Sequence, residues 1–202
     1  MILGSHNSMT YLRPRRWWMR LFRIFGRCQN KTIQQQFDSG VRCFDLRVSH
    51  TTNDGWSFSH GLIDYRLPAD FTEAPDIPNP LNYPVHSVLS LLNSLATDSD
   101  PVYIRFILEK INHVYDPALF QGLCEAIQKM YRHLTFIGGV YKNTWQQLYD
   151  FHDPITEADI AQPIGSMAAD ARWYERIIPI LSAHRTRKAP TPTARIVLKD
   201  FV

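Results

Sequence analysis

The chain has 202 residues, enough for a single domain with a substantial hydrophobic core. Hydrophobic residues make up 45% of it and charged residues 20%, which excludes wholesale disorder. No apolar run approaches the roughly 18 residues that cross a bilayer, and the net charge of +3 is too mild to indicate a nucleic-acid partner.

The apolar start of the chain, residues 1–3, predicts a short strand followed by a loop over residues 4–7. This loop places the imidazole of His6 and the amide of Asn7 after a strand, at the edge where α/β folds usually carry their chemistry. The simpler interpretation is a turn in which Asn7 and Ser8 bond their own backbone. An apolar stretch this short does not predict a signal peptide.

Residues 13–31 contain seven basic residues and no acidic one. Wound as an α-helix, residues 14–27 (PRRWWMRLFRIFGR) gather four arginines within an arc of about 60°, with the apolar side chains opposite. The four are Arg16, Arg20, Arg23 and Arg27. Such a helix is typical of a membrane interface, with Trp17, Trp18, Arg16 and Arg20 as contacts. An ordinary barrel helix with its apolar side on the core explains the pattern equally well.

Strand-like and helical stretches alternate along the rest of the chain. The predicted strands are residues 41–48, 56–60, 101–108 and 195–199. The predicted helices are residues 32–39, 85–96, 117–132, 144–151 and 168–184. Residues 67–84 are rich in proline and predict a long loop, a candidate site rim. This order predicts one α/β domain over residues 1–202, either a parallel sheet or a (β/α) barrel.

Strand alternation groups ionisable side chains on one face. In residues 41–48, Asp45 and Arg47 share a face, while Phe44, Leu46 and Val48 share the other and should pack under helices. In residues 101–110, Arg105 and Glu109 share a face by the same rule. Ionisable groups inside a barrel are costly unless they are paired or used, so structural ion pairs are the alternative to a functional site.

His6, Asp45, Arg47 and His60 each come at or near the end of a predicted strand. Two histidines and an arginine suit the cleavage of a phosphodiester: one imidazole accepts a proton, the other donates one, and the guanidinium holds the phosphoryl oxygens. We expect the other histidines at the surface, in loops or on helices. These are His50, His86, His113, His133, His152 and His184.

Three blocks of sequence, in this order and spacing, carry a resemblance to a known family. They are GSHNS at 4–8, CQNKTIQQQFDSGVRCFDLRV at 28–48 and SHG at 59–61. Together they resemble the catalytic X region of phosphatidylinositol-specific phospholipase C. The similarity is weaker at 101–110 and returns at 196–202 (IVLKDFV), where the chain resembles the closing strand of that family.

The resemblance implies a distorted or incomplete TIM-type barrel and a reaction in which a ring hydroxyl of inositol attacks the phosphorus. His6 then matches the general base and His60 the general acid. Arg47 stands where the metal-independent bacterial enzymes have an arginine, so the resemblance implies no metal or other cofactor. Asp45 would orient the attacking hydroxyl, and Asp200 would hold His6 in its productive tautomer.

Some residues depart from the bacterial pattern. The calcium-dependent branch of the family carries an asparagine at the position of Asn7, and Glu109 resembles one of its calcium ligands. If this chain used calcium, the ligands would be Asn7, Asp45 and Glu109. The substrate-binding candidates are Asn7, Arg105, Glu109 and Lys110. Residues 150–194 show no clear strand, so one or two strands of the barrel are expected to be missing or irregular.

These patterns favour a phosphoric diester hydrolase or lyase that cleaves phosphatidylinositol-like phospholipids to diacylglycerol and a (cyclic) inositol phosphate. One alternative is a glycerophosphodiester or sphingomyelin type of barrel phosphodiesterase, although Arg47 stands where those need an acidic metal ligand. Another is a lipid-binding module with a decayed site. The three cysteines show no CxxC spacing. We therefore expect a reducing compartment. We also expect a monomer that is cytoplasmic or peripheral to a membrane, with a phospholipid surface as its partner.

Overall fold

The computed structural model describes residues 1–51, 55–68, 71, 83–109, 117–138, 160–161, 195–200 and 202. The strands are β1 (Ile2–Ser5), β2 (Arg13–Pro14), β3 (Cys43–Thr51), β4 (Gly55–His60), β5 (Ile63–Arg66), β6 (Val102–Leu108), β7 (Leu134–Gly138), β8 (Ile160–Ala161) and β9 (Ile196–Lys199). The helices are the 3-10 helix η1 (Trp17–Phe22) and the α-helices α1 (Arg23–Gly26), α2 (Ile33–Asp38), α3 (Tyr83–Leu95) and α4 (Pro117–Met130).

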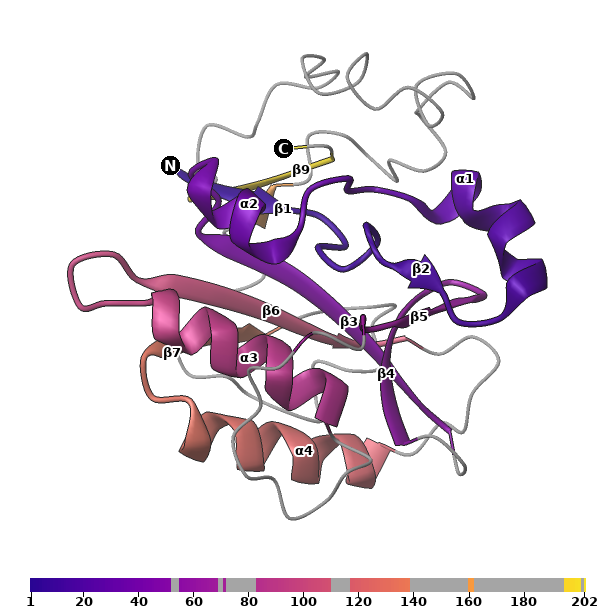
Figure 1. The fold of residues 1–202 in the computed structure, drawn as a ribbon. Coiled ribbons are helices and arrows are strands. Elements are labelled where there is room, and N and C mark those ends of the chain that lie inside the picture. Colours follow the sequence, from indigo (N-terminus) through magenta and orange to yellow (C-terminus); the bar gives the residue numbers. More distant parts are fainter. Residues whose placement is uncertain are drawn as a thin grey trace.

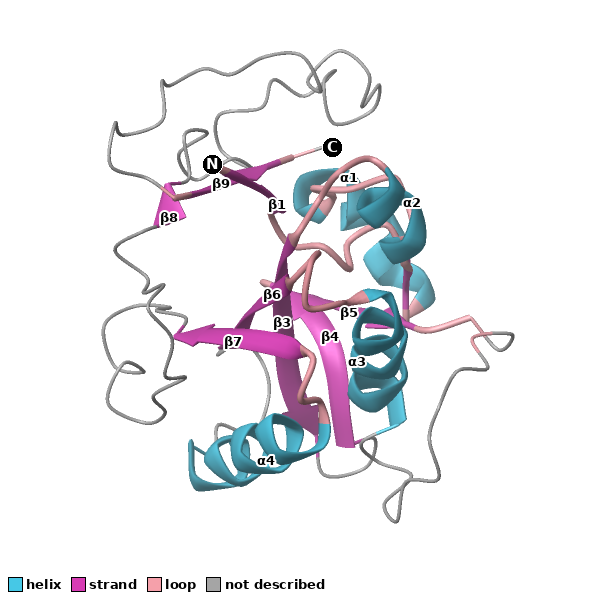
Figure 2. Cartoon of the chain, turned by 90° about the vertical axis from the view of Figure 1, so that its left-hand side faces the viewer, coloured by secondary structure: helices cyan, strands magenta, loops and turns pink. Residues whose placement is uncertain are grey.

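The centre of the molecule is a curled sheet of parallel strands. Within the described residues, parallel pairing runs in the order β8, β9, β1, β3, β6 and β7. Helices α3 and α4 lie along the outer side of this sheet, as Figures 1 and 2 show. Parallel strands covered by helices on the outside form a (β/α) barrel, and the described strands enclose part of one. The fold is therefore an incomplete TIM-type barrel, as predicted.

The two faces of β3 pack as strand alternation predicts. Phe44, Leu46 and Val48 are fully buried in the main hydrophobic core, against α3 residues such as Val85 and Leu89. The opposite face begins with Cys43, which belongs to a separate inner cluster. The inner cluster contains Cys43, Ile137, Ile196 and Leu198. The core that stabilises the domain therefore lies between sheet and helices, and β3 turns Asp45 and Arg47 to the barrel interior.

The third predicted strand differs from a parallel arrangement. β4 returns antiparallel to β3, with Val48 opposite Phe58, and β5 returns antiparallel to β4. The reason is the short connection: residues 52–54 cannot provide the crossover of about a dozen residues that a parallel pair needs. The hairpin also extends β3 to Thr51, beyond its predicted end. No pattern in the sequence predicts the short strands β2, β5, β7 and β8.

The predicted helix over residues 14–27 is wrong. Arg13 and Pro14 instead form β2, antiparallel to β5, and the backbone amide of Arg15 donates to the carbonyl of Asp64 at 2.8 Å. This pairing holds the chain extended, so the helical part begins only at Trp17. It then runs as the 3-10 helix η1 and the single turn α1 rather than as one amphipathic α-helix.

The remaining helix predictions are confirmed within the described residues. α2, α3 and α4 fall within two residues of their predicted ends, and Thr32 caps α2 in a capping box with Gln35. The surface prediction is wrong for two histidines. His86 on α3 is only 3% exposed, and its Nδ1 lies 2.8 Å from the Tyr131 hydroxyl. His50 is half-buried in β3 rather than in a loop or on a helix. The predicted helices 144–151 and 168–184, and most of the loop 67–84, lie outside the described residues.

Candidate active site

The candidate site forms where β3 changes its pairing partner. One edge of β3 pairs with β1 at Cys43 and Phe44, and the same strand pairs with β4 from Val48 onward. Between these two stretches lie Asp45 and Arg47, whose side chains face the barrel interior. His6 follows β1, and His60 ends β4. The two histidines therefore approach this point of β3 from different strands, and their ring centroids lie 6.2 Å apart.

The turn after β1 is held on β3 by several hydrogen bonds. The backbone amide of Asn7 donates to Asp45 Oδ2 at 3.1 Å, and that of Ser8 donates to the Asp45 carbonyl at 2.9 Å. Asn7 has a φ of 46°, a left-handed conformation that asparagine tolerates better than most residues. Ser8 Oγ donates to the Ser5 carbonyl at 3.0 Å, so the predicted local turn bond also forms. The turn is therefore stabilised by its own backbone hydrogen bonds, and it also positions His6.

His6 is bound at both ring nitrogens. Because Ser5 pairs with Lys199 in the parallel β1–β9 ladder, the next residue of each strand places His6 beside Asp200, with Nδ1 3.1 Å from Asp200 Oδ1. A carboxylate can only accept, so Nδ1 carries the proton and Nε2 accepts from Arg47 Nη2 at 2.8 Å. Burial, and then the charge of Arg47, hold the pKa of His6 well below its ordinary value. The ring is therefore neutral at pH 7, with an acceptor at Nε2.

Asp45 lies between two arginines. Its Oδ2 accepts from Arg47 Nη2 at 3.1 Å, and its Oδ1 accepts from Arg105 Nη1 at 2.9 Å, because Asp45 and Arg105 are partners in the β3–β6 ladder. Burial by itself would raise the pKa of this carboxyl, but the two guanidinium groups hold it below its ordinary range. Arg105 is thus paired with Asp45, and Glu109 Oε2 lies 3.8 Å from Arg47 Nη1. Lys110 lies outside the described residues.

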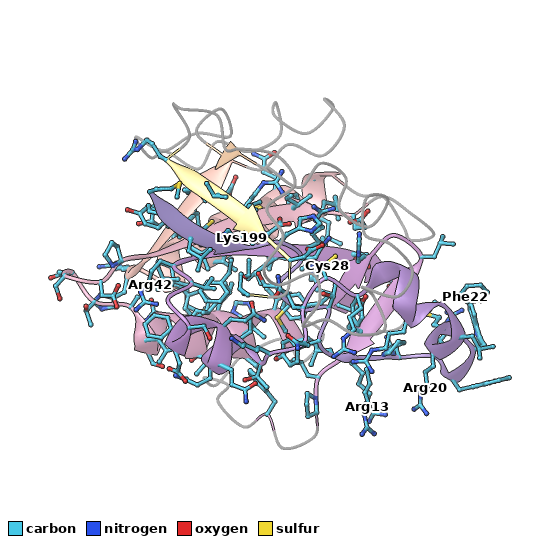
Figure 3. The ribbon with its side chains drawn as sticks, turned by 90° about the horizontal axis from the view of Figure 1, so that it is seen from above. Arg13, Arg20, Phe22, Cys28, Arg42 and Lys199 are labelled. Carbon is cyan, nitrogen blue, oxygen red and sulfur yellow. The ribbon has the colours of Figure 1, made fainter. Side chains whose placement is uncertain are left out.

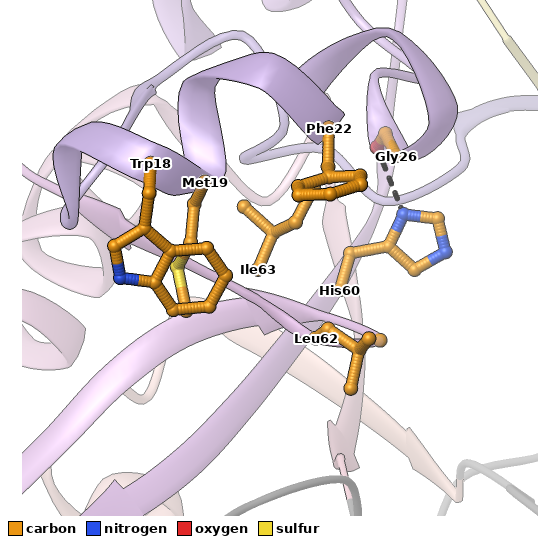
Figure 4. A pocket seen from close by; sticks show the side chains of 8 residues that line it. Trp18, Met19, Phe22, Gly26, His60, Leu62 and Ile63 are labelled. Atoms are coloured by element: carbon orange, nitrogen blue, oxygen red, sulfur yellow. Dashed lines mark hydrogen bonds between the residues drawn. The ribbon is translucent and has the colours of Figure 1, made fainter.

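His60 is oriented by a main-chain carbonyl. Its Nδ1 donates to the carbonyl oxygen of Gly26 at 2.8 Å, which turns Nε2 to the other side of the ring (Figure 4). A Cβ at position 26 would lie 2.9 Å from Ile63 Cδ1, so a larger residue there would require the Ile63 side chain to shift. The Asn7 amide, in contrast, contacts His6, with its Nδ2 3.1 Å from Nε2. The hydrogen bond that orients His60 therefore comes from Gly26, at the end of α1.

The residues around Cys28 belong to the site, although no sequence pattern assigns them a role. Gln29 Nε2 donates to the carbonyls of His6 and Lys199, at 3.1 and 2.8 Å, and so ties the ends of β1 and β9 together. Cys28 Sγ lies 3.9 Å from His60 Nδ1, and burial raises the pKa of its thiol. The signal available was their place in the second motif block. No spacing rule separates them from its other polar residues.

Two sets of residues near the site carry donor atoms of the kind that bind metal ions. His6, Cys28 and Asp200 have ligand atoms within 4.8 Å of one another. The calcium set inferred from the resemblance, Asn7, Asp45 and Glu109, fits poorly, because both carboxylate oxygens of Asp45 already accept from guanidinium groups. A divalent cation bound to Asp45 would have to displace Arg47 and lie beside Arg105. It would be repelled by the positive charges of both arginines.

A cavity of about 430 Å³ opens beside His60, between η1 and the turn that joins β4 to β5 (Figure 4). Its apolar walls are Trp18, Met19, Phe22, Leu62 and Ile63. We call it the apolar pocket. His60 also lines the pocket, so the pocket adjoins the polar site at this residue.

The segment η1 exposes large apolar side chains to water. The exposed fractions are 76% for Trp17, 72% for Leu21, 54% for Phe22 and 40% for Trp18. The predicted single basic face is wrong, because Arg23 donates to the carbonyl of Tyr11, and Arg27 to that of Gln29. Arg16 and Arg20 are exposed. Among the described residues, no helix has the length and apolar character needed to span a membrane.

The geometry defines an incomplete TIM-type barrel with a two-histidine polar site on its inner face. No protein-family model matches this sequence, and no curated protein matches it either. Among solved structures, it is similar to the phosphatidylinositol-specific phospholipase C from Listeria monocytogenes, with a TM-score of 0.53 and 13% identity over 99% of this chain and 87% of that one. This likeness establishes the fold.

A double mutant of the phosphatidylinositol-specific phospholipase C from Staphylococcus aureus also matches, with a TM-score of 0.38 and 18% identity. That match covers 64% of this chain, and the chain spans 36% of the S. aureus structure.

Proposed function

We propose that this protein is a phospholipase C-like phosphodiesterase that cleaves phosphatidylinositol-like phospholipids to diacylglycerol and a (cyclic) inositol phosphate. The observation that carries the proposal is the pair of unequal histidines. His6 is buried, neutral and an acceptor at Nε2, whereas His60 is half-buried and borders the apolar pocket. One is suited to take a proton from an attacking hydroxyl, and the other to give a proton to a leaving oxygen.

In the proposed first step, His6 Nε2 takes the proton of an inositol ring hydroxyl as its oxygen bonds to phosphorus. Arg47 now donates to Nε2, and its fork would turn to the phosphoryl oxygens when substrate enters. The bond from phosphorus to the glycerol oxygen breaks, and protonated His60 gives that oxygen its proton. Water opens the cyclic phosphate in a second step with the roles of the histidines reversed.

Three carboxylates keep this machinery aligned in the proposal. Asp200 accepts from His6 Nδ1 and so keeps Nε2 free of a proton. Asp45 holds the Arg47 fork from one side, and Glu109 lies near it on the other. Because Arg105 binds Asp45, we assign it to positioning Asp45 rather than to substrate. The buried charges of Arg47 and Arg105 supply the positive field, so we propose catalysis without a metal ion.

The apolar pocket favours a lipid over a glycerophosphodiester. The leaving oxygen must reach His60, and the alcohol attached to it then lies along Trp18, Phe22 and Leu62. A free glycerol fragment gains little from such walls, whereas each methylene that leaves water there contributes about 0.8 kcal/mol. The sphingomyelin alternative also has an apolar leaving group, but it lacks a ring hydroxyl to act as internal nucleophile.

The test is an assay of the intact protein on vesicles of phosphatidylinositol, with ³¹P NMR detection of cyclic inositol phosphate. We expect release that survives saturating EDTA, weaker cleavage of glycerophosphoinositol, and none of sphingomyelin. Activity that EDTA abolishes and calcium restores would contradict the metal-free mechanism and assign Asn7 and Glu109 as ligands. A folded protein that binds vesicles but cleaves no phosphodiester would be the decayed lipid-binding module.

A further inference from the structure

A second cavity, of about 510 Å³, borders η1 at Arg20 rather than at the residues that line the apolar pocket, and it is rich in arginine. Arg13 comes from β2, Arg15 from the segment that follows, Arg20 from η1 and Arg66 from the end of β5. We call this cavity the arginine pocket. None of the described residues that line it is acidic. Figure 3 shows Arg13 and Arg20 at one end of the molecule, near Phe22 and away from Lys199.

The arginines come together against their mutual repulsion. In the antiparallel pairing of β2 with β5, Arg13 stands directly opposite Arg66. Like charges at directly opposed positions destabilise a strand pair. All four side chains are exposed, so they lie within reach of a ligand. A phosphate group between them would turn this repulsion into several charge-assisted hydrogen bonds, the geometry that guanidinium groups provide best.

The position of η1 identifies the source of the phosphate. This helix presents Arg20 to the arginine pocket and Trp18 and Phe22 to the apolar pocket, so one short helix is the wall of both. Trp17 and Leu21 on the same helix are among the most exposed large apolar residues described. A soluble anion would gain nothing from these side chains. A bilayer would bury them and present phosphates at the same depth.

We propose that the arginine pocket binds the phosphate of an anionic phospholipid that is not the substrate. Docked in this way, the enzyme would rest on the bilayer through η1, with the apolar pocket and His60 at the same surface. The lipid in the arginine pocket would retain the enzyme while substrate molecules turn over at His6 and His60. The site itself does not depend on catalysis, so it can be tested with lipids that are not substrates.

The test compares two double variants of the whole chain. Arg13→Gln/Arg66→Gln removes the opposed pair, and Lys129→Gln/Arg132→Gln removes the same charge from exposed positions at and just after the end of α4. Binding is measured by sedimentation with vesicles of phosphatidylcholine alone and with added phosphatidylglycerol. We expect the first variant to lose about tenfold or more of its partition onto the anionic vesicles, and the second to stay near wild type. Binding to phosphatidylcholine alone should change little in either variant.

Thermal unfolding serves as the folding control, and we expect the first variant to melt at or above the wild-type temperature because a repulsion is removed. Equal losses in the two double variants would overturn the proposal, since net charge would then explain the binding. Wild-type binding of the Arg13→Gln/Arg66→Gln variant to the anionic vesicles would also overturn it, since the opposed arginines would then hold no lipid phosphate. Because no substrate is present, failure of the proposed phosphodiesterase activity would not change these results.

Discussion

The polar cluster inside the barrel and the segment η1 depart in opposite directions from the usual distribution of side chains. The cluster, defined as His6, Asp45, Arg47, Arg105 and Asp200, buries charge, and each member has a partner within it. The segment η1 instead leaves tryptophan, leucine and phenylalanine in water. Buried charge is tolerated only when it is paired or used, and clustered exposed apolar groups mark a surface that something else covers.

The polar cluster and η1 obtain their stability in different ways. The cluster depends on partners from four strands, so a change in one side chain is felt by the others. η1 is fixed by its backbone and by Met19, which is buried, so its outward side chains can be changed without disturbing the fold. The first region therefore predicts effects on stability and chemistry together, and the second predicts effects on binding alone.

The largest expected effect is on stability, from Asp45→Ala. This change leaves Arg47 and Arg105 buried without their shared carboxylate, which should lower the free energy of unfolding by about 3–5 kcal/mol. Asp100→Asn is the control, because Asp100 pairs with Arg42 at the surface and should matter far less. Urea unfolding of both variants measures the difference. Similar small losses would show that the cluster is not held by its charges.

The second effect is on turnover, from His6→Ala and His60→Ala. Each should lower kcat by about 100-fold or more, because general acid-base groups contribute 10²–10⁴-fold. His133→Ala is the control, since His133 is exposed beyond α4. A variant that keeps wild-type turnover on phosphatidylinositol would remove that histidine from the mechanism. Retained melting temperatures would separate lost chemistry from lost folding.

The third effect distinguishes adsorption from the apolar pocket. Trp17→Ala/Leu21→Ala removes two exposed side chains that do not line the pocket, whereas Trp18 lines it. We expect about tenfold weaker activity on vesicles, from the apolar area no longer buried in the interface, and normal activity on a monomeric short-chain substrate. Leu119→Ala/Met130→Ala, on α4, is the matched control. Equal loss on both substrates would place η1 in the folding core.

The smallest effect is a pH dependence of stability. Burial and Arg47 lower the pKa of His6 in the folded state, so the unfolded chain binds more protons here. The stability that the neutral His6 contributes to the folded state is therefore present above the unfolded pKa of about 6.5, and it is lost as the pH falls below that value. As the pH is lowered from 8 to 5, the melting temperature of His6→Gln should fall less steeply than that of the wild type. His86, whose pKa burial also lowers, remains in both proteins, so it cancels in the comparison. Parallel curves would contradict a neutral His6.

The sequence by itself determined which side chains share a face of a strand and which residues come directly after a strand. The period of two in residues 41–48 assigned Phe44, Leu46 and Val48 to the core and Asp45 and Arg47 to the interior, as the structure has them. It also determined α2, α3 and α4, because their apolar spacing and the capping box of α2 are local features. Local periodicity can be read from a chain because backbone geometry fixes it within a few residues.

Only the tertiary structure decided which strand lies beside which. The antiparallel return of β4 brings His60 to His6, the β3–β6 register gives Arg105 to Asp45, and β2 pairing with β5 replaces a predicted helix and opposes Arg13 to Arg66. Each contact joins residues far apart in the sequence, and its register is set when the whole sheet packs its faces at once. A side chain's neighbours across a sheet are a property of that packing, which no single stretch of the chain contains.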